Sequence, residues 1–183
     1  KDVKKLTIIL SKMSVVKKFY KDNFSPLLEK NNLFCFLIII LIFSFDRISK
    51  VKIIDYQVKN SQIYINDFMN FDLTWNTGIG FGLFSSNSNL IYNSTTAIIF
   101  AIIVFIIYLI LKSSFLDKLF LSLVLGGALG NLYDRFTYKA VPDFIDIHYK
   151  SFHWFTFNIA DIFITAGIIM LLVKELFIKN EKN

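Results

Sequence analysis

The amino-acid sequence predicts an integral membrane protein, mainly α-helical, with four transmembrane helices and a small β-cradle outside the membrane. Hydrophobic residues make up 55% of the 183 residues, and the mean hydropathy of +0.54 exceeds that of most soluble domains. Three stretches lack any charge, namely 33–45, 90–111 and 162–173. A membrane-crossing helix needs about 20 mostly apolar residues, and these stretches approach or reach that length.

Residues 1–30 form a basic segment that we expect on the cytoplasmic side. Positive charge beside an apolar run sets the orientation of a membrane protein, and eight lysines lie here: Lys1, Lys4, Lys5, Lys12, Lys17, Lys18, Lys21 and Lys30. The net charge of +6 therefore indicates topology, and without a nucleic-acid-binding motif we expect no nucleic-acid partner. The first helix is predicted at about 27–53. We expect it to be retained, because no small-x-small cleavage site follows it.

Asp46 and Lys50 share one face of this helix, since they stand four residues apart. The spacing favours an ion pair at the membrane boundary, with both side chains reaching toward the lipid headgroups. The alternative is a buried pair that supports a functional site.

The segment 54–90 has the pattern of a small sheet outside the membrane. Phe71, Leu73 and Trp75 alternate with polar residues, which is the period of a half-buried strand. A turn is predicted at 76–78, and glycines at positions 78, 80 and 82 allow a backbone to approach a ligand closely. We predict a cradle over the site; an ordinary hairpin without a ligand would share the pattern.

Three further helices are predicted at about 95–111, 119–132 and 158–177, so that residues 31–179 form a single membrane-embedded domain. Gly126 and Gly130 have the spacing that allows close helix packing. Lysines near both termini and between the second and third helices predict that both termini are cytoplasmic. Residues 133–157 then form an outward-facing connection.

Two aspartates at the ends of the later apolar runs are the candidate catalytic residues. Asp143 lies in the outward connection, and Asp161 lies at the start of the last apolar run. The chain between them is long enough to fold back and bring the two carboxyl groups together at the outer leaflet. Two close carboxyl groups share a proton, so one can deprotonate a water while the other protonates the scissile group. The pair predicts an aspartyl hydrolase that needs neither a metal nor another cofactor.

Neighbouring polar residues fit supporting roles. Arg135 can hold a carboxylate bidentately, and Asn131 and Asn158 can orient side chains without adding charge. Structural explanations are also open. Asp134 and Arg135 can form a simple helix-end pair, and Asn158 can cap the last helix.

Two other functions would use similar residues. A metal-dependent hydrolase needs residue types that ligate zinc, and five are present: Asp143, Asp146, His148, His153 and Asp161. No strict ligand spacing accompanies them, and the aromatic surroundings favour a membrane-interface position for both histidines. A small proton-coupled transporter could use the acids as a relay, but the two halves of the sequence show no repeat.

Blocks of sequence between Asp46 and Gly167 together resemble the lipoprotein signal peptidases, also called signal peptidase II or prolipoprotein signal peptidase. The first block, 46–50, is similar to the family's D-x-x-x-K, and 76–82 is similar to N-x-G-x-A-F, with Gly80 where Ala is usual. Residues 126–135 match G-G-x-x-G-N-x-x-D-R in full. Val141-Pro-Asp-Phe and Phe157-Asn-Ile-Ala-Asp resemble the V-x-D-F and F-N-x-A-D blocks.

The resemblance implies an aspartyl endopeptidase whose catalytic dyad is Asp143 and Asp161. Its substrate would be a membrane-anchored prolipoprotein that carries diacylglycerol on a cysteine, cleaved just before that cysteine. Five residues would line or brace the site, with Asp46 and Lys50 supporting it: Asn76, Gly78, Asn131, Arg135 and Asn158.

The resemblance also implies a location in the bacterial cytoplasmic (inner) membrane, as a multi-pass protein with its active site toward the outer leaflet. Membrane lipids are expected partners, and a monomer is expected.

Overall fold

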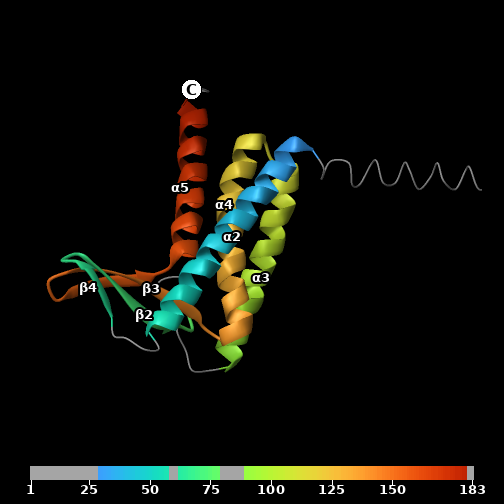
Figure 1. Cartoon of the computed structure of the whole chain (residues 1–183). Helices are drawn as coiled ribbons and strands as arrows, with labels where there is room; N and C mark the ends of the chain where they lie inside the picture. The colour runs from blue at the N-terminus through green and yellow to red at the C-terminus, as the bar shows by residue number, and fades with distance from the viewer. Residues whose placement is uncertain (1–28, 58–61, 79–88, 181–183) are drawn as a thin grey trace, which may run out of the picture.

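The computed structural model of the chain describes residues 29–57, 62–78 and 89–180. It contains four long helices, α2 (Lys30–Gln57), α3 (Asn89–Lys112), α4 (Phe115–Tyr138) and α5 (Ile159–Asn180), and four strands, β1 (Ile63–Asn66), β2 (Met69–Asn76), β3 (Val141–Tyr149) and β4 (Phe152–Phe157). Figure 1 shows the strands at one end of the helices, where α2 and α4 end and where α3 and α5 begin.

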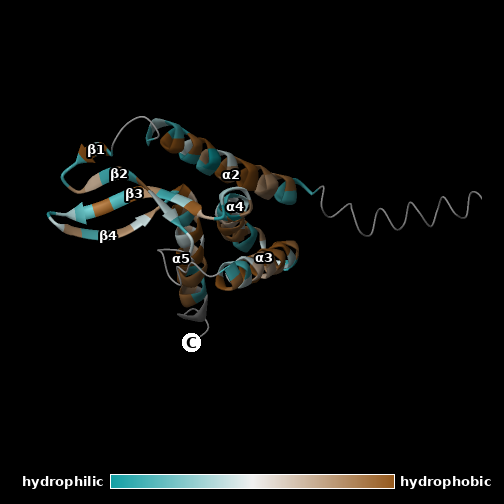
Figure 2. Ribbon diagram, turned by 90° about the horizontal axis from the view of Figure 1, so that it is seen from below, coloured by the Kyte–Doolittle hydropathy of each residue, from teal (hydrophilic) through white to brown (hydrophobic). Residues whose placement is uncertain are grey.

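Helix α4 is the central helix and contacts each of the other three, as the end-on view in Figure 2 shows. Its glycines make these contacts close. A Cβ added at Gly126 would lie 2.9 Å from the Cβ of Ile42 on α2, and one at Gly127 would lie 2.5 Å from the Ala160 carbonyl oxygen on α5. A Cβ at Gly130 would collide with the Asp46 carboxylate. The close packing predicted from the glycine spacing is confirmed, and it brings polar residues of α2 and α5 against α4.

Three of the described helices are long and apolar enough to cross a membrane, namely α2, α3 and α4. Large apolar side chains cover their outer surfaces, as an integral membrane protein requires; Leu41 on α2 and Phe105 on α3 are examples. Helix α5 is not among these three; it has 22 residues, with Asp161 in its first turn and Lys174 and Glu175 near its end. A fourth crossing by α5 therefore stays a prediction.

The helices are longer than hydropathy predicted. Helix α3 begins at Asn89 instead of near 95, and within it the Thr95 and Thr96 hydroxyls donate to the Tyr92 carbonyl oxygen. Helix α4 extends beyond 119–132 at both ends. Ser114 caps its start, accepting a hydrogen bond from the Asp117 amide. Hydropathy locates the part of a helix that faces lipid, whereas capping and hydrogen bonding decide where the helix ends.

The sheet is antiparallel with the strand order β1-β2-β3-β4. The sequence predicted strands within 54–90, where β1 and β2 lie, and described 133–157 only as a connection. In the structure α4 continues to Tyr138, and the rest of the connection forms β3 and β4. The first six residues of β3 are all buried. A strand covered on both faces lacks the alternation that reveals half-buried strands.

Strand β2 contains an irregularity that turns Asn76 inward. Phe71 and Leu73 are half-buried, as alternation predicted, but the pairing with β3 shifts register between Phe71 and Thr74. After the shift Trp75 is 45% exposed and Asn76 is buried. The irregularity therefore directs Asn76 toward β3. The predicted glycine positions 80 and 82 lie outside the described residues.

Candidate active site

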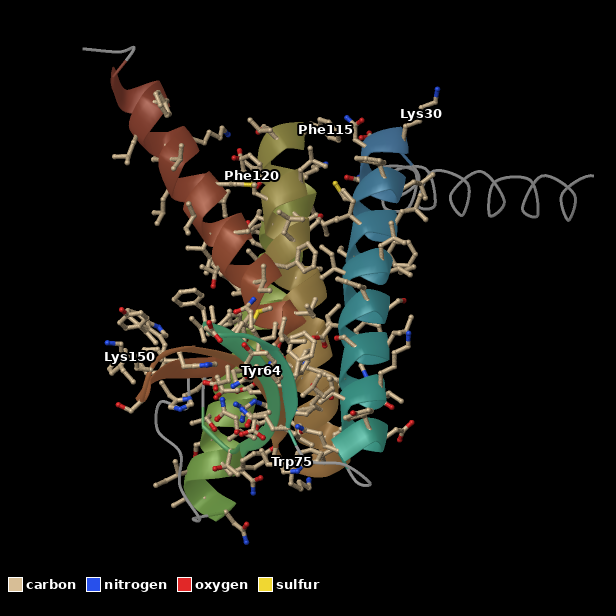
Figure 3. The ribbon with its side chains drawn as sticks, turned by 60° about the vertical axis from the view of Figure 1, so that its left-hand side comes forward. Lys30, Tyr64, Trp75, Phe115, Phe120 and Lys150 are labelled. Atoms are coloured by element: carbon tan, nitrogen blue, oxygen red, sulfur yellow. The ribbon has the colours of Figure 1, made fainter. Side chains whose placement is uncertain are left out.

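A cavity of about 210 Å³ lies where β2, β3, α3, α4 and α5 meet. Apolar side chains from the helices and from β3 form part of its wall, among them Ile99, Val141 and Ile164. Most of its polar lining consists of predicted site residues: Asn76, Asn131, Arg135, Asp143 and Asp161. Figure 3 shows this region of side chains between the sheet and the helices.

Asp143 on β3 is only 2% exposed, and two carboxamides hold its carboxyl group. Asn76 Nδ2 donates to Oδ2 at 2.9 Å, and Asn158 Nδ2 donates to Oδ1 at 2.6 Å. Burial, followed by the nearby negative charge of Asp161, raises the pKa of Asp143 from 3.8 to about 7. The two carboxamide hydrogen bonds oppose this change, since they favour the ionised form. Asp143 can therefore gain or lose a proton near neutral pH.

Asp161 lies in the first turn of α5 and is held by a reciprocal cap. Its amide donates to Asn158 Oδ1 at 3.1 Å, and the Asn158 amide donates to Asp161 Oδ2 at 3.2 Å. This is the capping-box arrangement, which satisfies two amide groups at a helix start. Asn131 Nδ2 on α4 donates to the other carboxylate oxygen, Oδ1, at 2.9 Å. The Asp161 carboxylate thus has a fixed orientation.

Asn158 links the two candidate catalytic residues. Its side-chain nitrogen binds Asp143, while its side-chain oxygen and its amide bind Asp161. The sequence left open whether Asn158 caps the helix or orients a carboxyl group, and in the structure it does both. The β3–β4 hairpin supplies the fold-back that sequence analysis expected between the two aspartates.

Lys50 and Asp46 are a fully buried pair, each with 0% of its side chain exposed. The preferred prediction that they reach toward the headgroups was wrong. Lys50 Nζ donates to Asp46 Oδ2 at 2.7 Å, to Asp134 Oδ2 at 2.7 Å and to Asn131 Oδ1 at 2.8 Å. Because Asn131 also holds Asp161, Lys50 fixes a residue that orients the candidate dyad.

Asp134 and Arg47 complete this network, although neither was predicted to take part in it. Arg47 forms an ion pair with Asp134 and lies over the Tyr133 ring at 4.6 Å. Together with Asp46 and Lys50, they give the network two positive and two negative side chains. The charges therefore balance, as a buried charge network requires. The simple Asp134–Arg135 helix-end pair that the sequence left open does not form, because the partners of Asp134 lie on another helix. No local spacing could have revealed partners more than 80 residues away.

Arg135 does not make the bidentate carboxylate contact that was predicted. Its Nη2 donates to the Gly78 carbonyl oxygen, and its own carbonyl oxygen accepts from the Tyr92 hydroxyl at 2.8 Å. The Gly78 amide donates to Asn76 Oδ1 at 2.8 Å, so Arg135 braces the turn that holds Asn76. Within the described residues, Nε and Nη1 of Arg135 are buried without a hydrogen-bond partner. Arg135 is also one of the residues that line the cavity.

The five residues of the metal-hydrolase alternative do not form one site. Asp143 and Asp161 line the cavity, whereas Asp146, His148 and His153 gather separately on the β3–β4 hairpin. A single ion held by all five is therefore incompatible with the fold.

The chain is similar to known proteins over most of its length. Residues 38–177 match the family model described as signal peptidase (SPase) II. A lipoprotein signal peptidase of Pelagibacter ubique is 50% identical over 155 residues, covering 84% of this chain and 93% of that protein. One from Anaplasma phagocytophilum is 37% identical over 150 residues, covering 80% of this chain and 94% of that protein.

The fold is also similar to a solved structure. A bacterial membrane enzyme determined by the in meso method at 2.3 Å resolution superposes with a TM-score of 0.70 at 26% identity, covering 81% of this chain and 91% of that one. The extent of the family match and the identities with full-length relatives show that the chain belongs to the signal peptidase II family.

Proposed function

We propose that this protein removes signal peptides from prolipoproteins as an aspartic endopeptidase, with Asp143 and Asp161 as the catalytic dyad. Cleavage falls just before a cysteine that carries diacylglycerol. The observation that carries the proposal is the shared Asn158, which holds both carboxyl groups at one cavity. Membership of the signal peptidase II family supports the substrate class.

The dyad acts by exchanging protons with a water and with the peptide bond. The ionised carboxylate takes a proton from the water as the water oxygen attacks the scissile carbonyl carbon, and the protonated carboxyl group donates its proton to the carbonyl oxygen. Collapse of the tetrahedral intermediate breaks the C–N bond, and a proton passes to the leaving nitrogen. A pKa near 7 suits Asp143 to this exchange at neutral pH.

Supporting residues keep the dyad in position. Asn76 and Asn158 bind Asp143, and Asn131 connects Asp161 to Lys50. The unpartnered Nε and Nη1 of Arg135 can donate to a backbone carbonyl of the bound substrate. Fixed donors of this kind stabilise developing charge without reorganising during the reaction.

We place the protein in the bacterial cytoplasmic membrane as a monomer of four crossings, with α5 as the fourth. The apolar middle of α5 and the lysine distribution support this topology, with both termini cytoplasmic and the dyad at the outer leaflet. A dyad at the outer leaflet can reach the cleavage site of a substrate whose lipid and signal helix already lie in the bilayer. The metal-dependent hydrolase and the transporter are not favoured, because the family match points to a peptidase.

The test is cleavage of a lipidated and an unlipidated prolipoprotein by purified protein. Asp143→Asn and Asp161→Asn should each lower the rate on the lipidated substrate by roughly a hundred- to ten-thousand-fold, the contribution typical of general acid–base groups. Asp72→Asn on the exposed face of β2 is the matched control and should leave the rate unchanged. Unaltered unfolding midpoints would show that both dyad variants fold.

Two results would contradict the proposal. Substantial turnover by either dyad variant would exclude the dyad. Activity of a His148→Ala/His153→Ala variant that is lost to a chelator and restored by zinc would assign the chemistry to a metal in the cavity instead.

A further inference from the structure

A cluster of metal-ligating side chains lies on the β3–β4 hairpin, away from the catalytic cavity. Asp146 and His148 come from β3, and His153 comes from β4 directly opposite His148. One ligand atom from each residue lies within 4.8 Å of the others. Figure 3 labels Lys150 in the turn of this hairpin, which extends beyond the helices.

The spacing of the three groups suits a tetrahedral ion. Bonds of about 2.0–2.1 Å to nitrogen and oxygen place two tetrahedral ligands roughly 3.3 Å apart. The His153 Nδ1 and Asp146 Oδ2 atoms are 2.9 Å apart, and His148 Nδ1 lies 3.5 Å from the same oxygen. The two imidazole rings stack with centroids 5.2 Å apart and both have Nδ1 near Asp146. Small movements of the side chains would bring all three to bonding distance.

Without an ion, the cluster leaves one buried atom unsatisfied. His153 Nδ1 lies within hydrogen-bond distance of both Asp146 oxygens. Within the described residues, His148 Nδ1 is buried and has no hydrogen-bond partner. Buried polar atoms usually have partners, and such an exception calls for an explanation. A metal ion would use the lone pair of this nitrogen.

We propose that Asp146, His148 and His153 bind one divalent transition-metal ion, with zinc as the ion that the ligand set favours. Two imidazoles and a carboxylate form a nitrogen and oxygen set of the kind that zinc accepts. The His153 side chain is 55% exposed, so water can occupy the fourth position. Neither histidine lines the catalytic cavity. The ion cross-links β3 to β4 and stabilises the hairpin.

The chain has few other side chains that bind zinc strongly, so the proposed site can be tested by itself. The chain has two histidines and one cysteine. Cys35 is buried near the start of α2, whereas the strands lie where α2 ends. The His148→Ala/His153→Ala double variant therefore removes every imidazole of the chain. A purified full-length protein without a polyhistidine tag has no other histidine to confuse the measurement.

The experiment is equilibrium dialysis of Zn²⁺ against the protein in detergent, with the unfolding midpoint measured at each zinc concentration. Wild type should bind one ion and gain thermal stability as zinc is added. Removing one ligand should weaken binding more than about tenfold, since even loss of a residue that only orients a ligand costs 10–100-fold. His153→Ala is the first variant to make, because this exposed residue can change without disturbing folding.

Two controls identify the site. Asp161→Asn should keep zinc binding, because this residue lies in the catalytic cavity. Lys150→Ala should also keep it, because the residue is in the same hairpin and has no ligand atom in the cluster. The absence of saturable zinc binding by wild type would overturn the proposal. So would binding that survives in the double histidine variant and is lost in Asp161→Asn, since the ion would then be in the cavity.

Discussion

Replacement of Lys50 by Met should destabilise the protein strongly, because Lys50 neutralises two buried carboxylates. Its Nζ donates three hydrogen bonds of 2.7–2.8 Å, to Asp46, Asp134 and Asn131. Methionine has a similar length but can neither donate nor carry charge. Removing one partner of a buried ion pair costs about 3–5 kcal/mol, because the other partner stays buried without compensation.

Contacts that the two carboxylates keep in the Lys50→Met variant limit the loss of stability to this range. Counting the lost hydrogen bonds at about 1.5–3 kcal/mol each would give a larger sum. Arg47 still pairs with Asp134, however, and the Ala160 amide still donates to Asp46 Oδ1 at 3.0 Å. We therefore expect a loss of about 3–5 kcal/mol in the free energy of unfolding.

The assay is SDS-induced unfolding in mixed micelles, followed by tryptophan fluorescence. Lys174→Met is the matched control, since Lys174 pairs with Asp117 while both side chains are partly exposed. An exposed pair contributes about 0–1 kcal/mol. Equal losses in the free energy of unfolding of the two variants would contradict a Lys50 network that is buried and tightly paired. So would a Lys50→Met protein as stable as wild type.

Two further predictions concern pH and orientation. Folding raises the pKa of Asp143 from 3.8 to about 7, so between about pH 4 and pH 7 the folded protein holds a proton at Asp143 that the unfolded chain has lost. The free energy of unfolding should therefore fall as pH rises through this window. Asp143→Asn should flatten the pH profile of the unfolding midpoint. An unchanged profile would contradict the raised pKa. In intact cells, with Cys35 replaced by Ala, a membrane-impermeant thiol reagent should label Lys150→Cys in the hairpin but not Ser113→Cys between α3 and α4. The reverse labelling pattern would invert the topology.

Residue type and hydropathy alone determined the class of this protein. Apolar stretches of membrane length identify helices because lipid selects for such composition whatever the neighbours are. Asp143 and Asp161 stood out for the same reason, since carboxylates beside such stretches are costly. The strand at Phe71 and Leu73 was also predictable, because one of its faces is partly buried and the other is exposed.

Only the tertiary structure decided which groups meet. Asp134 stands 84 residues from Lys50 in the sequence, and Gly78 stands 57 residues from Arg135. Strand β3 was missed because burial on both faces removes the periodic pattern. The pairing of His148 with His153 depends on the hairpin register. Composition and periodicity are local properties of a chain, whereas charge pairing and strand pairing join distant segments, so only the packed fold specifies the partners.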